Sequence, residues 1–561
     1  MTRRKWLALT LVTAPTVALM LATITGSAAT GKPAALRPTV GRAIRHDVSP
    51  PLSQMAASVQ RTVRLPQEVN PLKAPPQRTG RPDLVGAPDP LRQTQARLPS
   101  SQAATPQPLV NFEGLSDDDN AAVVGFRVVP PDTEGDVGLT HYVQWINLVF
   151  AVYDKSTGAI VAGGGPFAGN SIWVGFGGPC QDNNDGDPIV LYDHLADRWL
   201  LSQFSINEGV QCVAISQTGD PLGSYFRWAF AVSPGQNNDY PKFGLMPDAY
   251  YLSLRDFPSG DGDFASAVAF DRAALLAGDP AATFVKFSLP CLSNNCPDGI
   301  QPPHLEGPAP PFGTPGIFSR AWDDDFDGPL FGTDGYRLWE FRPDFGSPTS
   351  STFTELSIVP SAGYDSRMCG FFQATCVPQP GGGERLDPLD ELQMYRAQYR
   401  HFAAHDSLLI NTTVDATGHN VAGIRWAELR RLAGAWSLHQ EGTYAPAGGD
   451  HRWMGSAAMD KNGNIALGYS VSSRQTFPSI RYTSRMAADP PGTMPGGEVE
   501  LVAGSDVQRG SFHRWGDYST MSVDPVDGCT FWYTQEYQRN DDGRKDFDFK
   551  TRIGAFKLPG C

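Results

Sequence analysis

The sequence predicts an all-β protein, a β-propeller for which seven blades is the preferred count and six the alternative. The chain of 561 residues contains 58 Gly and 48 Pro, and only 19% of its residues are charged. This composition favours short strands joined by tight turns over long helices. A hairpin-like unit also recurs along the chain, as a propeller requires.

The recurring unit begins with a polar or charged residue, continues as an alternating strand, and turns at Asp, Asn or Gly into a second strand. Five stretches align on a Gly turn followed by an Asp turn, and two looser stretches fill the gaps between them. The five are 133–147, 184–204, 240–254, 451–473 and 513–537, and the looser two are 318–342 and 399–430.

The spacing of these units also distinguishes between β architectures. Steps from Gly135 to Gly516 average about 63 residues against about 40–50 for a four-stranded blade, so long loops such as 302–316 must take up the excess. The alternatives are a β-solenoid or an array of β-sandwiches, whose domains repeat at about 100 residues. We expect the strand 109–115 to complete the last blade and close the ring.

The first 29 residues have the features of a secretory signal peptide. Arg3, Arg4 and Lys5 precede an apolar stretch at 6–24, and small residues suited to cleavage follow at 27–29. The alternative is an uncleaved membrane anchor. The sequence therefore predicts a secreted protein with no membrane span after cleavage.

Residues 30–108 differ in composition from the rest of the chain. They are rich in Pro, Ala, Arg and Gln, and contain eleven Lys or Arg against four Asp or Glu. Such a segment cannot bury enough apolar surface to fold alone, which predicts a disordered linker or pro-segment before a propeller domain at 109–561. The whole chain carries a net charge of −14, so the propeller domain is acidic, which argues against nucleic acid as a partner.

The eight cysteines favour disulfides, because their number is even and the chain is predicted to be exported. Proximity along the chain suggests four pairs, although a sequence alone cannot fix the connectivity. The pairs are Cys180–Cys212, Cys291–Cys296, Cys369–Cys376 and Cys529–Cys561.

Two turns resemble the Asp-box of sialidase-like propellers, in which Ser, Asp, Gly and an aromatic residue recur at set spacings. The first, in 456–470, has Ser456, Asp460, Gly463 and Tyr469, with looser spacing and Tyr where Trp is usual. The second, in 519–534, has Ser522, Asp524, Gly528 and Trp532. In that family the box is a structural hairpin on the rim, so the resemblance supports the fold more than the function.

The polar starts of the units supply the candidate site, because the first strand of each blade lines the central channel. Asp136, Asp187 and Asp517 each follow a glycine and are the catalytic candidates, since glycoside hydrolysis needs two carboxylates. The alternative is that each carboxylate only caps its own turn. The ligand-binding candidates are Lys242, Arg320, His401, Arg452, Trp453, Arg514 and Trp515.

The resemblance to sialidases does not extend to their mechanism. Arg320, Arg452 and Arg514 could imitate the arginine cluster that holds a substrate carboxylate in that family. However, the early Arg-Ile-Pro signature is absent, and no nucleophile pair can be assigned. Trp453 and Trp515 follow two of these arginines directly and could stack on them or on a ligand, although inter-blade packing is the alternative.

Calcium is the candidate cofactor, because two turns are dense in carboxylates. Asp182 and Asp185 lie in 181–188, and Asp323 and Asp325 lie in 322–328. Hard cations prefer such oxygen clusters, but neither turn has the EF-hand spacing. A solvated acidic turn without metal is the alternative.

The sequence therefore predicts a secreted monomer that binds carbohydrate or a cell-surface polymer at the axial mouth, and it leaves open whether the protein also cleaves that ligand as a glycoside hydrolase-like enzyme. The alternative is a non-catalytic adhesion or scaffold propeller. An active site requires Asp136, Asp187, Lys242, Arg452 and Arg514 to converge around an open pocket. Charges that pair off without leaving a cavity would favour the scaffold.

Overall fold

The chain divides into Met1–Ala35 and a compact unit, Leu36–Cys561. The computed structural model describes residues 36–55, 67–68, 86–99, 101–258, 264–291, 295–369, 375–382, 384–509, 513–540, 543 and 548–561. The predicted signal peptide, residues 1–29, lies outside these described residues.

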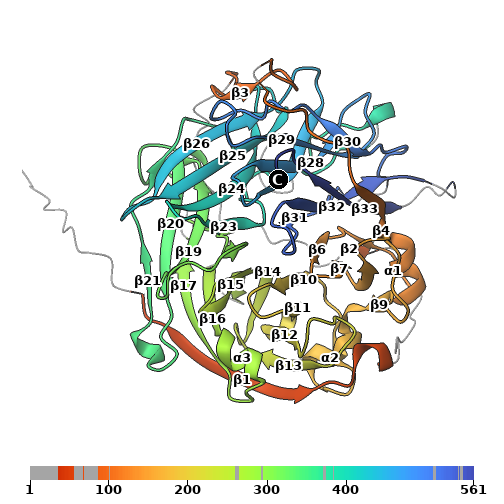
Figure 1. Ribbon diagram of the computed structural model, residues 1–561, viewed down its shortest axis with the longest axis vertical. Helices are drawn as coiled ribbons and strands as arrows, with labels where there is room; N and C mark the ends of the chain where they lie inside the picture. The colour runs from red at the N-terminus through yellow and green to blue at the C-terminus, as the bar shows by residue number, and fades with distance from the viewer. Residues whose placement is uncertain are drawn as a thin grey trace, which may run out of the picture. The chain divides into compact units, whose positions relative to one another are not determined.

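The compact unit is all-β and built from antiparallel sheets that follow one another around a common centre in chain order (Figure 1). The first sheet is β6 (Glu134–Val137), β7 (His141–Ile146), β8 (Val149–Asp154) and β9 (Phe167–Ala168). The second set is β10 (Ile189–Asp193), β11 (Arg198–Ser205), β12 (Val210–Ser216) and β13 (Tyr225–Phe230). The third set is β14 (Gln236–Leu245), β15 (Ala249–Pro258), β16 (Phe264–Asp271) and β17 (Thr283–Pro290).

The second half of the chain continues the same pattern. One sheet is β19 (Gly316–Trp322), β20 (Gly335–Arg342), β21 (Thr352–Glu355) and β22 (Val359–Pro360). The next is β23 (Ala397–His401), β24 (Asp406–Asp415), β25 (Ala422–Arg431) and β26 (Ser437–Tyr444), with β18 (Pro303–Leu305) parallel to β23. The last two are β27 (His451–Met459), β28 (Ile465–Ser472), β29 (Ser479–Arg485) and β30 (Val499–Val502), then β31 (Thr520–Val523), β32 (Thr530–Gln538), β33 (Phe549–Lys557) and β4 (Val110–Ser116).

Strand β4 closes the ring, because it precedes all these sheets in sequence but completes the last of them. It pairs antiparallel with β33, with Phe112 opposite Ile553. Behind this pairing Tyr142 stacks on Trp532, with ring centroids 5.4 Å apart, so the first sheet packs directly on the last. The prediction that residues 109–115 complete the final sheet is confirmed.

The core lies between neighbouring sheets, since nearly every strand is buried on both faces. Between the first two sheets, Trp145 and Phe150 pack with Trp199 and Leu201. The same layering of apolar side chains recurs around the ring. Large aromatic residues suit these wedge-shaped layers because each ring removes much apolar area from water.

Helices are short and lie in the connections. They are α1 (Asp117–Val123), α2 (Pro179–Asp182), α3 (Arg272–Ala277) and α4 (Asp324–Asp327), with 3₁₀ turns η1 (Leu52–Gln54), η2 (Gly169–Trp173), η3 (Ile206–Glu208), η4 (Pro348–Ser350) and η5 (Pro380–Gly382). Within the described ranges, none of these helices has the length and apolar character needed to cross a membrane.

Part of the segment predicted as a disordered linker is folded. Strand β1 (Thr39–Val48) pairs with β17 through its first half and with β13 through its second, joining the outer edges of two sheets (Figure 1). Further along, β3 (Arg92–Gln93) adds to β26, and β2 (Gln67–Glu68) pairs with β5 (Val128–Val129). The prediction for 30–108 is therefore wrong for these residues, because a segment without its own core can still add strands to existing sheet edges.

All eight cysteines form disulfides, and no cysteine is free. The four pairs expected from proximity along the chain are those in the structure. Disulfides persist in oxidising compartments, so they fit an extracellular protein.

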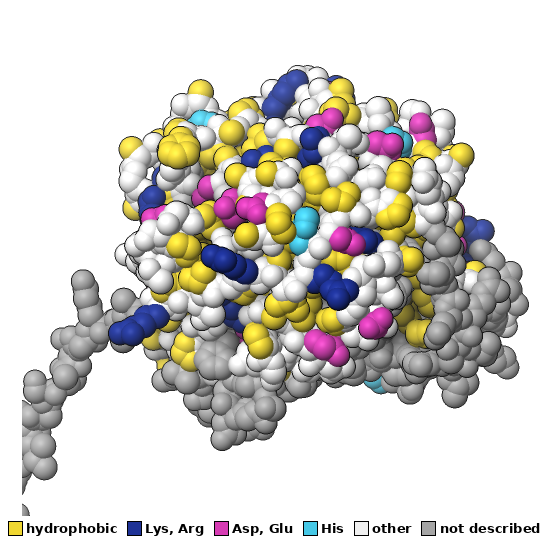
Figure 2. Space-filling view, turned by 90° about the horizontal axis from the view of Figure 1, so that it is seen from below, with side chains coloured by type: hydrophobic (Ala, Val, Ile, Leu, Met, Phe, Trp, Pro, Cys, Tyr) yellow, Lys and Arg dark blue, Asp and Glu magenta, His cyan; other side chains and the backbone are white. Residues whose placement is uncertain are grey.

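Basic and acidic side chains are interspersed on the face of the molecule shown in Figure 2. Apolar side chains are scattered among them rather than joined in one patch. Surfaces of this mixed kind favour solubility.

Candidate functional site

The axial strands, which are the first strands β6, β10, β27 and β31 of their sheets, define two ends of the central channel. We call the end where β6, β10, β27 and β31 begin the start face, and the end where they finish the end face. Four predicted site residues meet at the start face in a buried axial cluster, and each is at most 5% exposed. The cluster comprises Asp132, Asp187, Asp239, Lys242, Arg514 and Asp517.

The lysine is the centre of this cluster. Its ammonium nitrogen lies 3.5 Å from the ring centre of Tyr240 and 3.8 Å from that of Tyr518, and it donates to the Pro241 carbonyl at 3.1 Å. Burial lowers the pKa of Lys242 to about 8, although Asp187 opposes the shift. Burial and the neighbouring Asp239 raise the pKa of Asp187 to about 8. The cluster is thus a desolvated polar core.

The backbone shows which residues of the repeats are equivalent. Asp132, Asp187 and Asp517 all have left-handed φ angles, of 48°, 46° and 52°, just before their axial strands begin. Asp tolerates this conformation better than most residues. The sequence alignment matched Asp136 with Asp187 and Asp517, and this register is wrong by four residues: Asp132 is their counterpart, and Asp136 lies further along β6.

Arg452, Trp453 and Trp515 do not face the channel. The Arg452 guanidinium donates to both carboxylate oxygens of Glu498, at 2.7 and 2.9 Å. Trp453 packs on Trp515 with ring centroids 5.6 Å apart, and the Trp515 indole donates to Ser470 Oγ at 2.9 Å. Both tryptophans therefore pack between sheets, which was the alternative to ligand contact.

Two further ligand-binding candidates are also held by protein partners. Arg320 is buried and donates to Asp327 at 3.1 Å and to the Glu391 carbonyl at 2.7 Å. His401 Nδ1 lies 2.7 Å from Asp406 Oδ1 near the outer end of its strand. Of the five residues expected to converge, Asp187, Lys242 and Arg514 therefore lie together in the buried axial cluster, whereas Asp136 and Arg452 lie outside it.

A small open pocket lies at the opposite end of the channel, the end face. Its volume is about 60 Å³. Five parts of the chain contribute polar side chains to it: they are Asp136, Tyr192 with His194, His304 with Glu306, Arg400, and Asp524. We call it the end-face pocket, and it includes one of the predicted catalytic residues.

Two carboxylates in this pocket have opposite environments. Asp136 lies 3.3 Å from the Arg396 guanidinium and accepts from the Tyr192 amide at 2.8 Å, so its carboxyl group faces a charged and a neutral donor. Burial, and then Asp136 itself, raise the pKa of Glu306 to about 7. Pairs of carboxyl groups whose surroundings separate their protonation states are typical of acid–base sites.

The two pocket histidines are held neutral. Burial lowers the pKa of His304 well below its usual value, and Arg396 adds to this shift. Burial likewise lowers the pKa of His194, whose Nε2–H donates to the Gly307 carbonyl at 2.7 Å. His304 Nδ1 is buried without a hydrogen-bond partner among the described residues. A neutral imidazole with a free nitrogen can accept a hydrogen bond from a bound group.

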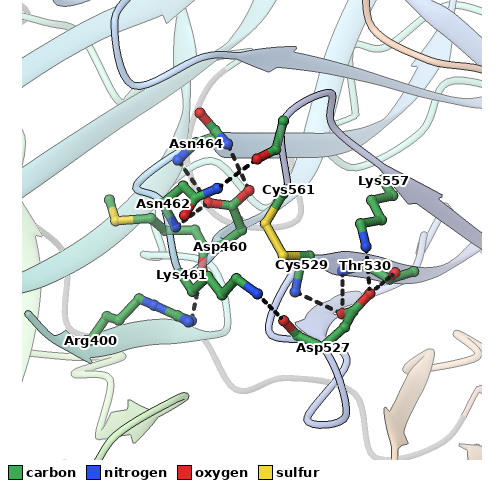
Figure 3. Close-up of a disulfide and its surroundings, with 12 residues drawn as sticks. Arg400, Asp460, Lys461, Asn462, Asn464, Asp527, Cys529, Thr530, Lys557 and Cys561 are labelled. Atoms are coloured by element: carbon green, nitrogen blue, oxygen red, sulfur yellow. Dashed lines mark hydrogen bonds and ion pairs between the residues drawn. A yellow bond between two sulfur atoms is a disulfide. The ribbon is translucent and has the colours of Figure 1, made fainter.

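The two Asp-box-like turns contact one another beside this pocket (Figure 3). Asp460 accepts from the amides of Asn462 and Asn464 at 2.8 and 3.0 Å, which fixes the first turn. Lys461 connects the turns, because its amide donates to the Gly528 carbonyl and its ammonium to the Asp527 carbonyl. The Asp460 carboxylate therefore serves the structure of its own hairpin.

In the two acidic turns predicted to bind calcium, Asp323 and Asp185 use carboxylate oxygens on protein donors. Both oxygens of Asp323 accept hydrogen bonds, from the Asp325 and Phe326 amides and from Ser366. Asp185 accepts from the Ile206 amide, and Asp182 lies in helix α2. Across the described part of the chain, no group of three or more His, Cys, Asp or Glu is placed to hold a metal ion. Calcium stays a prediction from sequence.

Sequence reasoning missed most of the end-face pocket. Glu306 and His304 fall in the stretch assigned to a long loop, yet Pro303–Leu305 forms β18 and pairs with β23, which begins at Ala397. The only signal was a histidine and a glutamate in an otherwise Pro- and Gly-rich stretch. Arg396 and Arg400 carry no local motif, because their partners come from distant sheets.

Comparison with known proteins gives only weak structural similarities. No family model matches the sequence, and no curated protein matches it. An ulvan lyase of a polysaccharide lyase family is similar with a TM-score of 0.35 and 11% identity, over 85% of this chain and 96% of its own. An endo-arabinase from Bacteroides thetaiotaomicron gives 0.26 and 13%, over 55% and 95%, and Drosophila Plexin A in complex with Semaphorin 1b gives 0.35 and 7%, over 82% and 89%. These values are too low for an activity to be transferred.

Proposed function

We propose that this chain is an exported seven-bladed propeller that binds glycan at the end-face pocket and hydrolyses a glycosidic bond there. Glu306 acts as the proton donor, and Asp136 acts as the anionic carboxylate. The count of seven is supported by the described strands, because the nine-stranded sheet can be divided into two four-stranded sets joined by β1, beside five further sheets of four or more strands.

The observation that carries this proposal is the contrast between the two carboxyl groups. With a pKa of about 7, Glu306 keeps its proton near neutrality and can give it to a leaving oxygen. Asp136 faces the Arg396 guanidinium and is available as base or nucleophile. Glycoside hydrolysis needs this division of roles between two carboxyl groups.

The size of the pocket determines how a glycan would lie. A volume of about 60 Å³ suits a water molecule or one sugar substituent rather than a whole ring. The polymer would therefore cross the mouth of the pocket, with only the scissile oxygen and the attacking water inside. Arg400 and the neutral His194 line the same pocket and can orient sugar hydroxyls.

The second candidate function is a non-catalytic scaffold, and the start face favours it. There Arg514 pairs with Asp517, and Lys242 is enclosed by two tyrosines. Buried charges of this kind hold sheets together without meeting a ligand. Only the end-face pocket distinguishes the two functions.

The test is a hydrolysis screen on neutral and acidic polysaccharides with three proteins: the unmodified chain, Glu306→Gln and Asp136→Asn. Each variant is expected to lose at least a hundredfold in kcat while keeping its fold by circular dichroism. Glu500→Gln, an exposed carboxylate on the outer strand β30, is the control and is expected to retain full activity. Retained activity in Glu306→Gln would overturn the mechanism, and glycan binding without turnover in any protein would favour the scaffold. A parallel series with EDTA tests the predicted calcium at Asp182, Asp185, Asp323 and Asp325.

A further inference from the structure

A larger depression lies away from the end-face pocket. Its volume is about 580 Å³, within the range of about 300–1,000 Å³ that small-molecule sites occupy. Its walls come from three separate stretches: Pro380, Gly381 and Glu384 precede β23, Phe477 lies between β28 and β29, and Asp506 to Arg509 follow β30. We call it the start-face depression, because Gln508 in its wall donates to the Arg514 carbonyl at 2.8 Å.

The walls of the depression are fastened to each other. The Gln379 side chain donates to the Gln508 carbonyl at 3.1 Å and accepts from the Gln508 amide at 2.7 Å. At the end of β28, Ser472 Oγ donates to the Pro378 carbonyl at 2.8 Å. These bonds join the segment before β23 to the two turns beside it, so the depression is preformed rather than assembled by a ligand.

One wall carries an ion pair between a guanidinium and a carboxylate. Arg509 donates to both oxygens of Asp506, each at 2.6 Å. Burial alone would raise the pKa of Asp506, but the guanidinium holds it below its usual value. The Arg509 side chain remains 37% exposed, and the Glu384 side chain is 52% exposed. Fixed donors and acceptors therefore lie next to each other at the surface.

The other walls consist of an aromatic side chain and of glycine backbone without side chains. Phe477 is half-buried and lines the depression. Gly381 and Gly382 have φ angles of 74° and 71°, and a Cβ at either would meet nothing within 4 Å. Backbone without side chains beside an aromatic ring leaves room for a flat ligand to approach closely.

We propose that the start-face depression is a second, non-catalytic binding site for a neutral oligosaccharide. Phe477 stacks on the apolar face of one sugar ring, and Asp506, Arg509 and Glu384 hydrogen-bond its hydroxyls. Two carboxylates against one guanidinium disfavour an anionic ligand, and the polar walls disfavour a wholly apolar one. The inference rests on the proposed glycan-related function but needs no turnover at the opposite end of the channel.

The experiment measures binding without catalysis. Titration calorimetry on the full chain carrying Glu306→Gln uses cellohexaose, xylohexaose and chitohexaose, with oligogalacturonate as the anionic comparison. Adding Phe477→Ala or Arg509→Ala is expected to weaken the Kd of the bound hexasaccharide at least tenfold. The control is Arg342→Ala, which removes another exposed, ion-paired arginine outside both cavities.

Each outcome decides the proposal. Unchanged affinity in both Phe477→Ala and Arg509→Ala would overturn it, and so would tighter binding of oligogalacturonate than of every neutral hexasaccharide. If Phe477→Ala unfolds, Arg509→Ala carries the test, because its side chain is partly exposed. The hydrolysis screen separates this result from the proposed function: normal turnover in Glu306→Gln refutes the catalytic proposal, and the titration is then repeated with a hexasaccharide that the screen shows is not cleaved.

Discussion

The effect of Glu306→Gln on the free energy of unfolding should change sign between acid and alkaline pH. The folded chain holds the Glu306 carboxyl at a pKa of about 7, against 4.5 for an ordinary glutamate. Between these values the unfolded chain has lost the proton while the folded chain keeps it, so stability falls as pH rises from 4.5 to 7. At about 1.4 kcal/mol for each pKa unit, ionising Glu306 in the folded protein costs about 3 kcal/mol above pH 7.

A glutamine side chain cannot ionise, so this penalty is absent from the variant, but its hydrogen bonds are weaker than those of the carboxyl group it replaces. Glu306 accepts from the Val523 amide at 3.0 Å and from the Gln398 side chain. Losing part of these bonds costs about 1 kcal/mol at every pH. Glu306→Gln should therefore be about 1 kcal/mol less stable than the unmodified chain at pH 4 and about 2 kcal/mol more stable at pH 8.

The assay is urea denaturation of both proteins at pH 4 and pH 8, read as the change in their stability difference. Glu498→Gln is the control, because the Arg452 guanidinium outweighs burial and lowers the pKa of Glu498. That carboxylate stabilises the fold above its usual pKa and loses this contribution as pH falls, so its variant should show the opposite trend. A stability difference for Glu306→Gln that stays constant between the two pH values would refute the assignment of a protonated Glu306.

Three other perturbations have expected outcomes. Replacing Cys529 and Cys561 by alanine opens a loop with a sequence separation of 32, which should cost about 4 kcal/mol by loop-closure entropy, measured by urea denaturation with and without reductant. Trp532→Ala should lower stability by about 3–5 kcal/mol, since the ring is buried between the first and last sheets, and a loss below 1 kcal/mol would contradict that packing. Arg452→Ala should cost about 3–5 kcal/mol by removing the two-bond partner of the largely buried Glu498 carboxylate, while glycan turnover per folded molecule stays unchanged. A selective loss of glycan affinity in Arg452→Ala would restore the ligand-binding role predicted from sequence.

The parts of the fold that could be read from the sequence depend on local signals. Turn residues between alternating strands marked the hairpins, and the closing role of β4 followed from an isolated strand at the start of the domain. The disulfides were predictable because each cysteine pairs with its nearest neighbour along the chain. Each of these features is decided within a few tens of residues.

The candidate site was harder to predict because it depends on register and on distant pairing. The left-handed residue before each axial strand sets which side chains align, and in the first unit that residue is Asp132 rather than a Gly-Asp pair. Glu306 reaches the channel only because the short parallel strand β18 pairs with β23. Neither the φ angle of one residue nor the partner of a three-residue strand leaves a periodic pattern in the sequence.

The pairing of the N-terminal strands restricts when the molecule can become complete during synthesis. β1 needs β13 and β17, the bridge at Arg97 needs Gly496, and β4 needs β33, which ends at Lys557. Each of these early segments therefore remains unpaired until the ribosome has synthesised a partner that lies hundreds of residues further along the chain. The last sheet cannot form until β33 has been synthesised, so closure of the ring waits for that strand even if earlier sheets have already formed.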